Sequence, residues 1–177
     1  MTYPVYQPRE DSYLMQKVIK EYADGRVLDM GTGTGILAKE AAKTAISVIA
    51  ADINHVSIEF CRKNIKDKKI EFIVSDLFED ISTKFDLIIF NPPYLPKDDN
   101  IEDIALYGGK KGYELIMRFL NDAGKYIEKD GKIILLFSSL TNKEKIGEII
   151  KKNNFTYKEI SQEKQFFEVL YIYLIEK

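Results

Sequence analysis

The sequence has 177 residues, of which 45% are hydrophobic and 31% charged, and its formal net charge is −2. This composition is typical of a soluble globular protein and excludes a disordered or fibrous chain, and the length fits one domain with a sizeable core. No apolar run approaches the roughly 20 residues of a membrane helix, and the mild charge does not indicate a dedicated duplex-DNA binder. Cys61 is the only cysteine, which excludes an internal disulfide. We therefore expect one domain over residues 1–177 and, without a signal peptide, a cytoplasmic location.

The predicted elements alternate between helices and strands. An extended arm leads into an amphipathic helix, and Glu10, Asp11 and Ser12 are interpreted as the capping residues and first-turn acids of that helix. Apolar runs predict strands at 26–30, 47–51, 70–74, 85–90, 132–137, 155–160 and 168–175, and helices at 36–44, 56–65, 113–128 and 142–153. The last two strands are expected to form an antiparallel pair. This order predicts an α/β fold with an open, mostly parallel seven-stranded sheet and helices on both faces.

Polar residues follow four successive predicted strands at their carboxyl ends, and these residues are Asp29, Asp52, Asp76 and Asn91. In open parallel sheets the ligands bind at this edge. Asp52 lies about 20 residues beyond a glycine-rich loop, where a carboxylate can accept both hydroxyls of a ribose. Asp76 ends the next strand and is placed to meet the amine of an adenine. Three acids and an asparagine at one edge are hard to explain as helix capping alone.

The glycine-rich loop Gly31-Thr32-Gly33-Thr34-Gly35 joins a strand to a helix, which lets the backbone approach a ligand closely. The segment from Gly33 to Ala38 also matches the Gly-x-Gly-x-x-Gly/Ala pattern of nicotinamide-binding proteins. That match is weak, because the glycines should follow the strand directly and Gly33 lies four residues past Asp29. A carboxylate at Asp29 would repel a pyrophosphate and favours a cofactor with a positive group, such as S-adenosylmethionine.

The stretch Asn91-Pro92-Pro93-Tyr94 ends the fourth predicted strand. Proline has no backbone N–H and restricts the residue before it, so this turn is stiff. It presents the Asn91 side-chain oxygen, the Pro92 carbonyl and the Tyr94 ring. Two acceptors beside a ring suit a planar –NH2 group with two protons to donate. For this motif alone, an ordinary strand-ending turn remains the alternative.

These motifs resemble a known family. The stretch Asp29 to Gly35 together with Asn91 to Tyr94 is similar to the class I S-adenosylmethionine-dependent methyltransferases that modify planar amines. The opening Tyr6-x-Pro8-x-Glu10-Asp11-Ser12 and the later Gly108-Gly109-x-x-Gly112 resemble the HemK-type protein glutamine methyltransferases, in the short branch of archaea and eukaryotes. The resemblance covers the chain from Tyr6 onward. It implies a Rossmann-like class I methyltransferase domain, with an arm of residues 1–12 that closes over the cofactor and no metal in the site.

The resemblance also implies roles for individual residues. Ser12 would reach the carboxylate of S-adenosylmethionine, and the site would release S-adenosylhomocysteine. The family more often has threonine at this position, and glutamate where this chain has the shorter Asp29. The implied cofactor-binding residues are Ser12, Asp29, Gly31, Gly33, Asp52, Asp76, Leu77 and Asn91. The implied catalytic residues, which would hold the substrate amide, are Asn91, Pro92 and Tyr94.

The implied substrate is the glutamine of a Gly-Gly-Gln motif in a class I peptide-chain release factor. Members of the short branch work with a small zinc-binding activator subunit, which docks on the strand Ile70–Val74. That strand is apolar and would lie at a sheet edge, where an exposed apolar strand needs a cover. The helices of the chain itself are the alternative cover.

Two other functions remain open. Asn-Pro-Pro-Tyr fits the amine of adenine equally well, so a nucleic-acid methyltransferase that flips out its target base is the alternative enzyme. A noncatalytic module that senses the cofactor is the third reading, although cofactor binding does not require Asn91-Pro92-Pro93-Tyr94. His55 is expected at an exposed helix start and Cys61 as a small buried hydrophobe, while the role of the loop 96–112 stays open.

Overall fold

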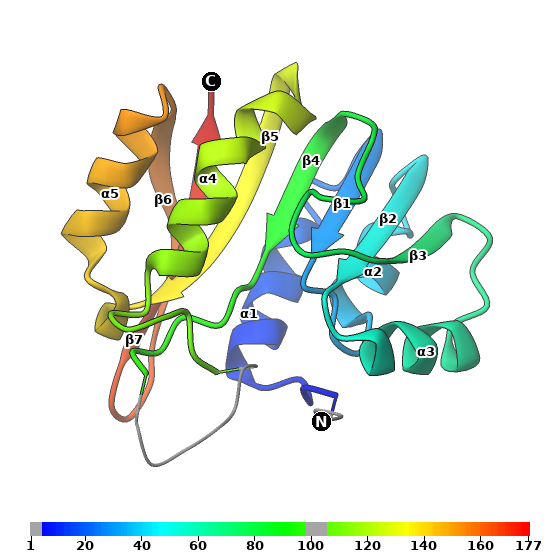
Figure 1. Ribbon diagram of the computed structural model, residues 1–177, viewed down its shortest axis with the longest axis horizontal. Helices are drawn as coiled ribbons and strands as arrows, with labels where there is room; N and C mark the ends of the chain where they lie inside the picture. Colours follow the sequence, from blue (N-terminus) through cyan, green and yellow to red (C-terminus); the bar gives the residue numbers. More distant parts are fainter. Residues whose placement is uncertain (1–4, 98–105) are drawn as a thin grey trace.

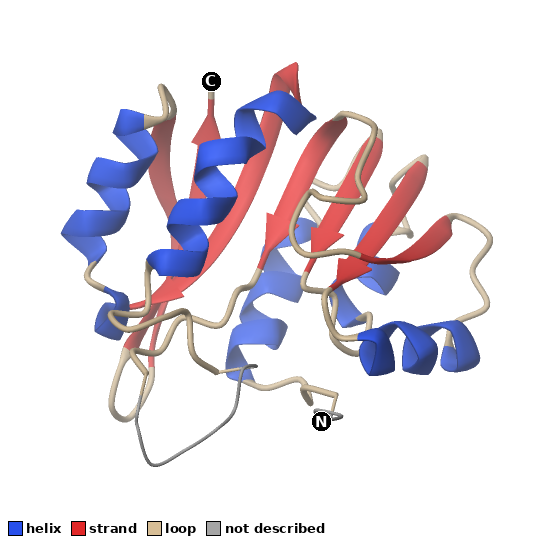
Figure 2. Cartoon of the chain, viewed as in Figure 1, coloured by secondary structure: helices blue, strands red, loops and turns tan. Residues whose placement is uncertain are grey.

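A computed structural model of the chain describes residues 5–97 and 106–177 (Figures 1 and 2). The strands are β1 (Arg26–Met30), β2 (Ser47–Asp52), β3 (Ile70–Val74), β4 (Phe85–Phe90), β5 (Ile127–Ser138), β6 (Thr156–Lys164) and β7 (Val169–Glu176). The helices are α1 (Glu10–Ile19), α2 (Ile36–Ala41), α3 (His55–Asn64), α4 (Glu114–Tyr126) and α5 (Lys143–Lys152), with a 3₁₀ turn η1 (Ser139–Thr141). Within the described ranges, no helix has the length and apolar character that a bilayer span requires.

The strands form one seven-stranded sheet in the order β3-β2-β1-β4-β5-β7-β6. The first five strands along the chain pair in parallel, and β7 runs antiparallel to both β5 and β6. The predicted fold class is therefore confirmed, including the terminal antiparallel pair and the edge position of β3. The strand order reverses between β1 and β4, and Met30 of β1 lies level with Ala51 of β2 and Phe90 of β4. The loops that follow these strands consequently meet at one point of the sheet edge.

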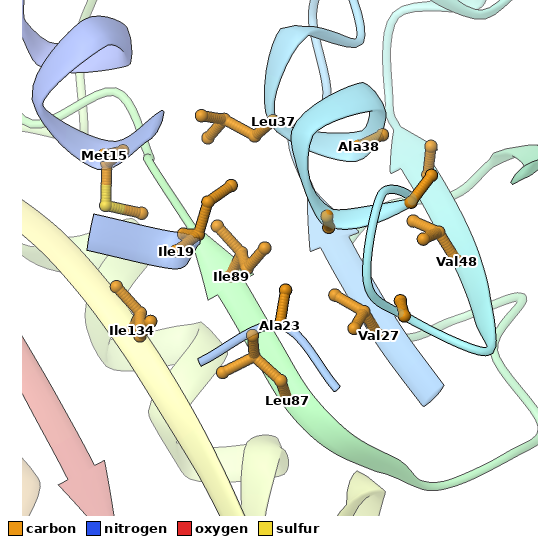
Figure 3. Close-up of a cluster of buried hydrophobic side chains, with 14 of the residues drawn as sticks. Met15, Ile19, Ala23, Val27, Leu37, Ala38, Val48, Leu87, Ile89 and Ile134 are labelled. Atoms are coloured by element: carbon orange, nitrogen blue, oxygen red, sulfur yellow. The ribbon is translucent and has the colours of Figure 1, made fainter. Parts of the chain in front are cut away.

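Helices cover both faces of the sheet, and each face has its own apolar core. Side chains from α1, α2 and α3 pack on one face, where Ile19 contacts a cluster that includes Val27 and Ile89 (Figure 3). Side chains from α4 and α5 pack on the other face, where Phe119 joins a cluster with Leu28. Successive side chains of a strand point to opposite faces, so burial of both faces explains why β1 and β4 are nearly continuous apolar runs.

Several predicted boundaries differ from the structure. Helix α2 ends at Ala41 instead of about Thr44, and strand β6 runs to Lys164 instead of Ile160. Strand β5 begins at Ile127, where the sequence predicted the end of a helix and a turn at 129–131. In the structure this segment extends the sheet, because Ile127 pairs with Phe85 and the ladder shifts register between Phe85 and Leu87. A Cβ on Gly131 would lie 2.9 Å from the carbonyl oxygen of Phe85, so the glycine is required by close strand contact and does not mark a turn.

A further correction concerns the first helix. Helix α1 begins at Glu10, and the side chain of its N-cap residue Arg9 makes no capping hydrogen bond. Asp11 and Ser12 therefore lie inside the first turn, which frees their side chains for other contacts.

Candidate active site

A cavity of about 490 Å³ lies at the carboxyl ends of the parallel strands. Its walls combine the N-terminal arm, the glycine-rich loop, the ends of β2 to β4, helix α4 and the turn between β6 and β7. The predicted site residues that line it are Ser12, Gly31, Gly33, Asp52, Asp76, Leu77, Asn91, Pro92 and Tyr94. Asp29 is the one predicted site residue outside these walls. The size suits a small-molecule cofactor with part of a substrate.

The glycine-rich loop forms the floor of the cavity. Gly31 and Gly33 have φ values of 71° and 54°, which favour glycine over residues with a side chain. A Cβ at Gly31 would find its nearest neighbour at 3.9 Å, on Phe90, and a Cβ at Gly33 would find the Tyr6 carbonyl oxygen at 3.8 Å. These are ordinary van der Waals distances, and both glycines line the cavity, so a ligand can lie against this backbone.

Asp29 lies beneath the loop and is only 1% exposed. Its Oδ2 accepts hydrogen bonds from Thr32 Oγ1 at 2.6 Å and from the Ala38 N–H at 3.0 Å, so it ties the loop to helix α2. Its Oδ1 is buried and has no hydrogen-bond partner among the described residues. Burial raises the pKa of Asp29 to about 7, although the bonds from Thr32 and Ala38 oppose the shift and the charge of Asp52 adds to it. A positive group nearby would favour the ionised form.

Asp52 ends β2 and faces the cavity. Its Oδ2 accepts from the Gly33 N–H and its Oδ1 from the Asn54 N–H, both at 2.8 Å. Burial raises the pKa of Asp52, and the two backbone hydrogen bonds oppose that rise. Each carboxylate oxygen keeps acceptor capacity beyond one hydrogen bond. The group is fixed in place and can still accept from two neighbouring hydroxyls.

The end of β3 adds Asp76 and Leu77. Asp76 Oδ2 accepts from Arg118 Nη2 of helix α4 at 3.0 Å, so an ion pair crosses the cavity wall. Leu77 has a φ of 50°, a left-handed conformation that is strained for a leucine, and its carbonyl accepts from Ser75 Oγ at 2.7 Å. Such strain is concentrated where a backbone is held for a ligand.

Asn91 lies at the cavity wall and has an acceptor that is unpaired among the described residues. Its Nδ2 donates to Asp11 Oδ2 at 3.0 Å, whereas its Oδ1 is buried and has no hydrogen-bond partner in the described part of the chain. An ionised carboxylate can only accept, so Asp11 requires the –NH2 end of Asn91 to face it. The amide oxygen must then point away from Asp11.

Asp11 is the centre of this contact network and is 5% exposed. It accepts from the Ser12 N–H at 2.7 Å and from the Tyr6 hydroxyl at 3.1 Å, in addition to Asn91. Asp11 is a first-turn acid of α1, as predicted, but that interpretation was incomplete because its carboxylate also joins the arm to the Asn-Pro-Pro-Tyr turn. The Ser12 hydroxyl also donates to it at 3.3 Å and lies at the cavity wall.

The Asn-Pro-Pro-Tyr turn is held in place by contacts with segments that are distant in sequence. The Tyr94 carbonyl accepts from Thr141 Oγ1 at 2.9 Å. A side chain on Gly108 would collide with the Pro93 carbonyl, and one on Gly112 would collide with the Tyr94 carbonyl, which explains these glycines. No described residue donates to the Pro92 carbonyl, which lies at the cavity wall. Residues 98–105 of the predicted loop 96–112 and residues 1–4 of the predicted arm lie outside the described residues.

Sequence reasoning missed several residues of the site. Tyr6, Arg118 and Glu168 line the cavity, and only Tyr6 belongs to a motif that the sequence displays. Glu168 Oε2 is buried without a hydrogen-bond partner among described residues. Burial and the nearby charges of Asp11 and Glu168 raise the pKa of Tyr94, so its phenol stays neutral.

Two minor expectations agree with the structure. His55 is exposed at the start of α3. Cys61 is fully buried, and its thiol donates to the Gly33 carbonyl at 3.3 Å. Burial raises the pKa of this thiol to about 12, so it stays protonated beneath the loop. The described residues contain no cluster of three or more His, Cys, Asp or Glu side chains that could hold a metal.

Comparison with known families identifies the chain. Residues 10–171 match the model of the methyltransferase small domain. The chain belongs to this methyltransferase family. A Methanocaldococcus jannaschii protein described as a candidate protein N5-glutamine methyltransferase is 40% identical over 154 residues, which cover 82% of this chain and 78% of that protein. The predicted HemK-type family and the enzyme class are thereby confirmed.

Bacterial relatives of the methyltransferase are longer. The release factor glutamine methyltransferase of Streptococcus pneumoniae is 36% identical over 62% of this chain, and the match spans 44% of its own length. Among solved structures, the E. cuniculi Mtq2–Trm112 complex, described as responsible for methylation of the eRF1 translation termination factor, superposes with a TM-score of 0.81. It is 25% identical, and the match covers 100% of this chain and 99% of that one. Trm5b of Pyrococcus abyssi shares the fold, with a TM-score of 0.70 at 24% identity over 98% of this chain and 51% of its own.

Proposed function

We propose that this methyltransferase transfers a methyl group from S-adenosylmethionine to the side-chain amide nitrogen of a glutamine, in the Gly-Gly-Gln motif of a class I peptide-chain release factor. The observation that carries the proposal is Asn91 Oδ1, a buried acceptor without a described partner. The Pro92 carbonyl and the Tyr94 ring lie at the same cavity wall. A primary amide has two N–H donors on one planar nitrogen, so it complements both acceptors at once.

The cavity residues fit the cofactor. The fixed carboxylate of Asp52 would accept hydrogen bonds from the ribose hydroxyls. Asp76 and the strained backbone of Leu77 would contact the adenine. The cavity beside Gly31 would accommodate the methionine part, and the carboxylate of Asp29, buried beneath the loop, would provide negative potential below it. When bound, S-adenosylmethionine supplies a methyl group on a positively charged sulfur.

The residues of the chain then act mainly by positioning the acceptor. An amide nitrogen is a poor nucleophile, because its lone pair is delocalised into the carbonyl. Asn91 Oδ1 and the Pro92 carbonyl oxygen each hold one N–H proton, which aims the lone pair away from them. The Tyr94 ring keeps the amide plane fixed, and correct orientation alone can account for several kcal/mol of a reaction barrier. The nitrogen would release one proton to water as or after the new N–C bond forms, so no strong base is needed beforehand.

We further propose that the edge of β3 binds a small activator subunit of the zinc-binding kind that the family resemblance implies. Among the described residues β3 pairs only with β2, which leaves one edge unpaired. Val74 at its end is 42% exposed, and Ile53 beside it is 58% exposed. An unpaired strand edge with exposed apolar side chains is suited to strand pairing with a partner. The similar Mtq2 chain is found in a complex with Trm112, which supports this proposal.

The test is methyl transfer from labelled S-adenosylmethionine to a release factor, with and without the candidate subunit. Label on the factor that disappears when the glutamine of Gly-Gly-Gln is replaced would establish the reaction. Adenine-containing DNA is the parallel acceptor, and label on DNA but not on the factor would refute the substrate. Asn91→Ala should abolish turnover and leave cofactor affinity nearly unchanged, which also separates an enzyme from a module that only senses the cofactor.

A further inference from the structure

The turn between β6 and β7 carries two phenylalanines in an unusual environment. Phe166 is 91% exposed and Phe167 is 86% exposed, more than any other large hydrophobic residue among those described. Their rings meet edge to face, with centroids 4.6 Å apart. The Gln165 N–H donates to the Glu168 carbonyl at 2.8 Å and closes the turn below them. The rings therefore add almost nothing to the apolar core and remain available to another molecule.

This turn is part of the mouth of the active-site cavity. Gln165 and Glu168, which flank the two phenylalanines, both line the cavity, as does Leu170 at the start of β7. Figure 1 shows the β6–β7 turn at the same edge of the molecule as the N-terminal arm. The turn therefore borders the same cavity as Asn91, and the two exposed rings lie next to residues of its wall.

Glu168 adds a polar group that lacks a partner. Its Oε2 is buried and has no hydrogen-bond partner among the described residues, although a buried acceptor is normally paired. Its charge contributes to the raised pKa of Tyr94, which places it near the ring expected to hold the amide. Glu168 Oε2 can therefore accept a hydrogen bond from an N–H group of a bound substrate.

We infer that the β6–β7 turn is the docking surface for the protein substrate. Phe166 and Phe167 pack against apolar side chains of the release factor beside its glycine-rich loop, and Glu168 Oε2 accepts a backbone N–H next to the methylated glutamine. The inference rests on the proposed function and names the surface that would recognise the substrate. A protein fits better than a nucleic acid, because the carboxylate of Glu168 would repel phosphates whereas a glycine-rich backbone can approach it closely.

The main test is the double variant Phe166→Ala/Phe167→Ala. It should raise KM for an intact release factor about tenfold or more, because two exposed aromatic side chains lose their burial in the complex. The kcat, the affinity for S-adenosylmethionine and the melting temperature should stay unchanged. A short peptide containing only Gly-Gly-Gln should show no difference between variant and wild type. The matched control is Ile46→Ala, which removes a 73% exposed apolar side chain just before β2, at the opposite end of the strands.

Glu168→Gln tests the polar contact separately. It should lower kcat/KM for both the intact factor and the peptide, since the contact lies next to the glutamine. Unchanged values in both assays would overturn the assignment of Glu168.

Direct binding of the factor, measured by calorimetry beside turnover, separates the docking surface from the reaction. A wild-type chain that binds the factor through the two phenylalanines without methylating it would refute the proposed reaction and keep the surface. Methylation with equal KM and equal binding in the double variant would overturn the surface and keep the reaction. A wild-type chain that neither binds nor methylates the factor would overturn both. Tighter binding of single-stranded adenine DNA, lost in the double variant, would assign the surface to a nucleic acid and overturn the inference.

Discussion

Replacing Asp11 with asparagine tests how Asn91 is oriented. In the structure Asn91 Nδ2 donates to Asp11 Oδ2 at 3.0 Å, and the carboxylate offers acceptors only. An amide at position 11 could turn its own –NH2 group toward Asn91. Asn91 would then favour the opposite orientation, in which its oxygen accepts from position 11 and its –NH2 faces the cavity, because the present orientation would set two –NH2 donors against each other. In that orientation the substrate amide meets a donor where it needs an acceptor.

The size of the effect follows from the burial of this contact. Asp11 is 5% exposed, so solvent screens the hydrogen bond little. A hydrogen bond to a charged group contributes about 1.5–3 kcal/mol. Since each 1.4 kcal/mol corresponds to about tenfold in rate, kcat should fall about 10- to 100-fold. The fold should persist, because the Ser12 N–H and the Tyr6 hydroxyl can still donate to the remaining carbonyl oxygen.

The assay is single-turnover methyl transfer to the release factor at saturating S-adenosylmethionine, with cofactor affinity measured by calorimetry. Glu10→Gln is the matched control, because Glu10 also lines the cavity and makes no described hydrogen bond. That control should leave the rate unchanged. Wild-type turnover by Asp11→Asn, with the cofactor bound normally, would refute the argument that Asp11 positions Asn91.

Three further predictions concern titration, backbone strain and the sheet edge. Burial raises the pKa of Asp29 from its ordinary value of 3.8 to about 7, so the native chain keeps a proton that the unfolded chain has lost between these values. Without cofactor, the free energy of unfolding should therefore fall as pH rises from about 4 to about 7, and Asp29→Asn should reduce that slope in urea titrations. Gly35 has a φ of 77°, and a Cβ there would lie 2.5 Å from Ile65 Cδ1, so Gly35→Ala should lower the free energy of unfolding by about 2 kcal/mol or more. Gly124→Ala in α4 is its control, since that Cβ would meet Phe155 at an ordinary 3.7 Å and should be neutral or stabilising. Val74→Lys should abolish co-purification of the activator subunit without changing the melting temperature, and an equally stable complex would place the subunit elsewhere.

The parallel strands could be predicted from sequence almost to the residue. Strands β3 and β4 match the predicted 70–74 and 85–90, because each is a short apolar run that ends at a polar or proline-containing stretch. The start of β5 could not be predicted in the same way. Lys129-Asp130-Gly131 has the local chemistry of a turn, and only the approach of the Phe85 backbone, distant in sequence, holds it in the sheet.

The same distinction between local patterns and contacts distant in sequence applies to the site residues. Asp52, Asp76 and Asn91 could be found because they follow strands whose carboxyl ends meet at one edge. Asp11 looked like a first-turn acid, since its contact with Asn91 spans 80 residues of sequence. Arg118 lies on an amphipathic helix among other charges, and nothing in its local sequence separates a cavity residue from a surface one.

The buried oxygens without partners give the strongest argument for how the site works. The described residues have three, namely Asp29 Oδ1, Asn91 Oδ1 and Glu168 Oε2. Leaving a buried acceptor unpaired costs about 1–3 kcal/mol of stability, so three such acceptors in one chain call for a functional explanation. Under the proposed function and the further inference, the acceptor amide would pair with Asn91 and the substrate backbone with Glu168, while the positive charge of the cofactor would act on Asp29 through the loop. Stability lost in the free chain then returns in full as binding energy only when cofactor and substrate are both bound, which favours the complex that is ready to react.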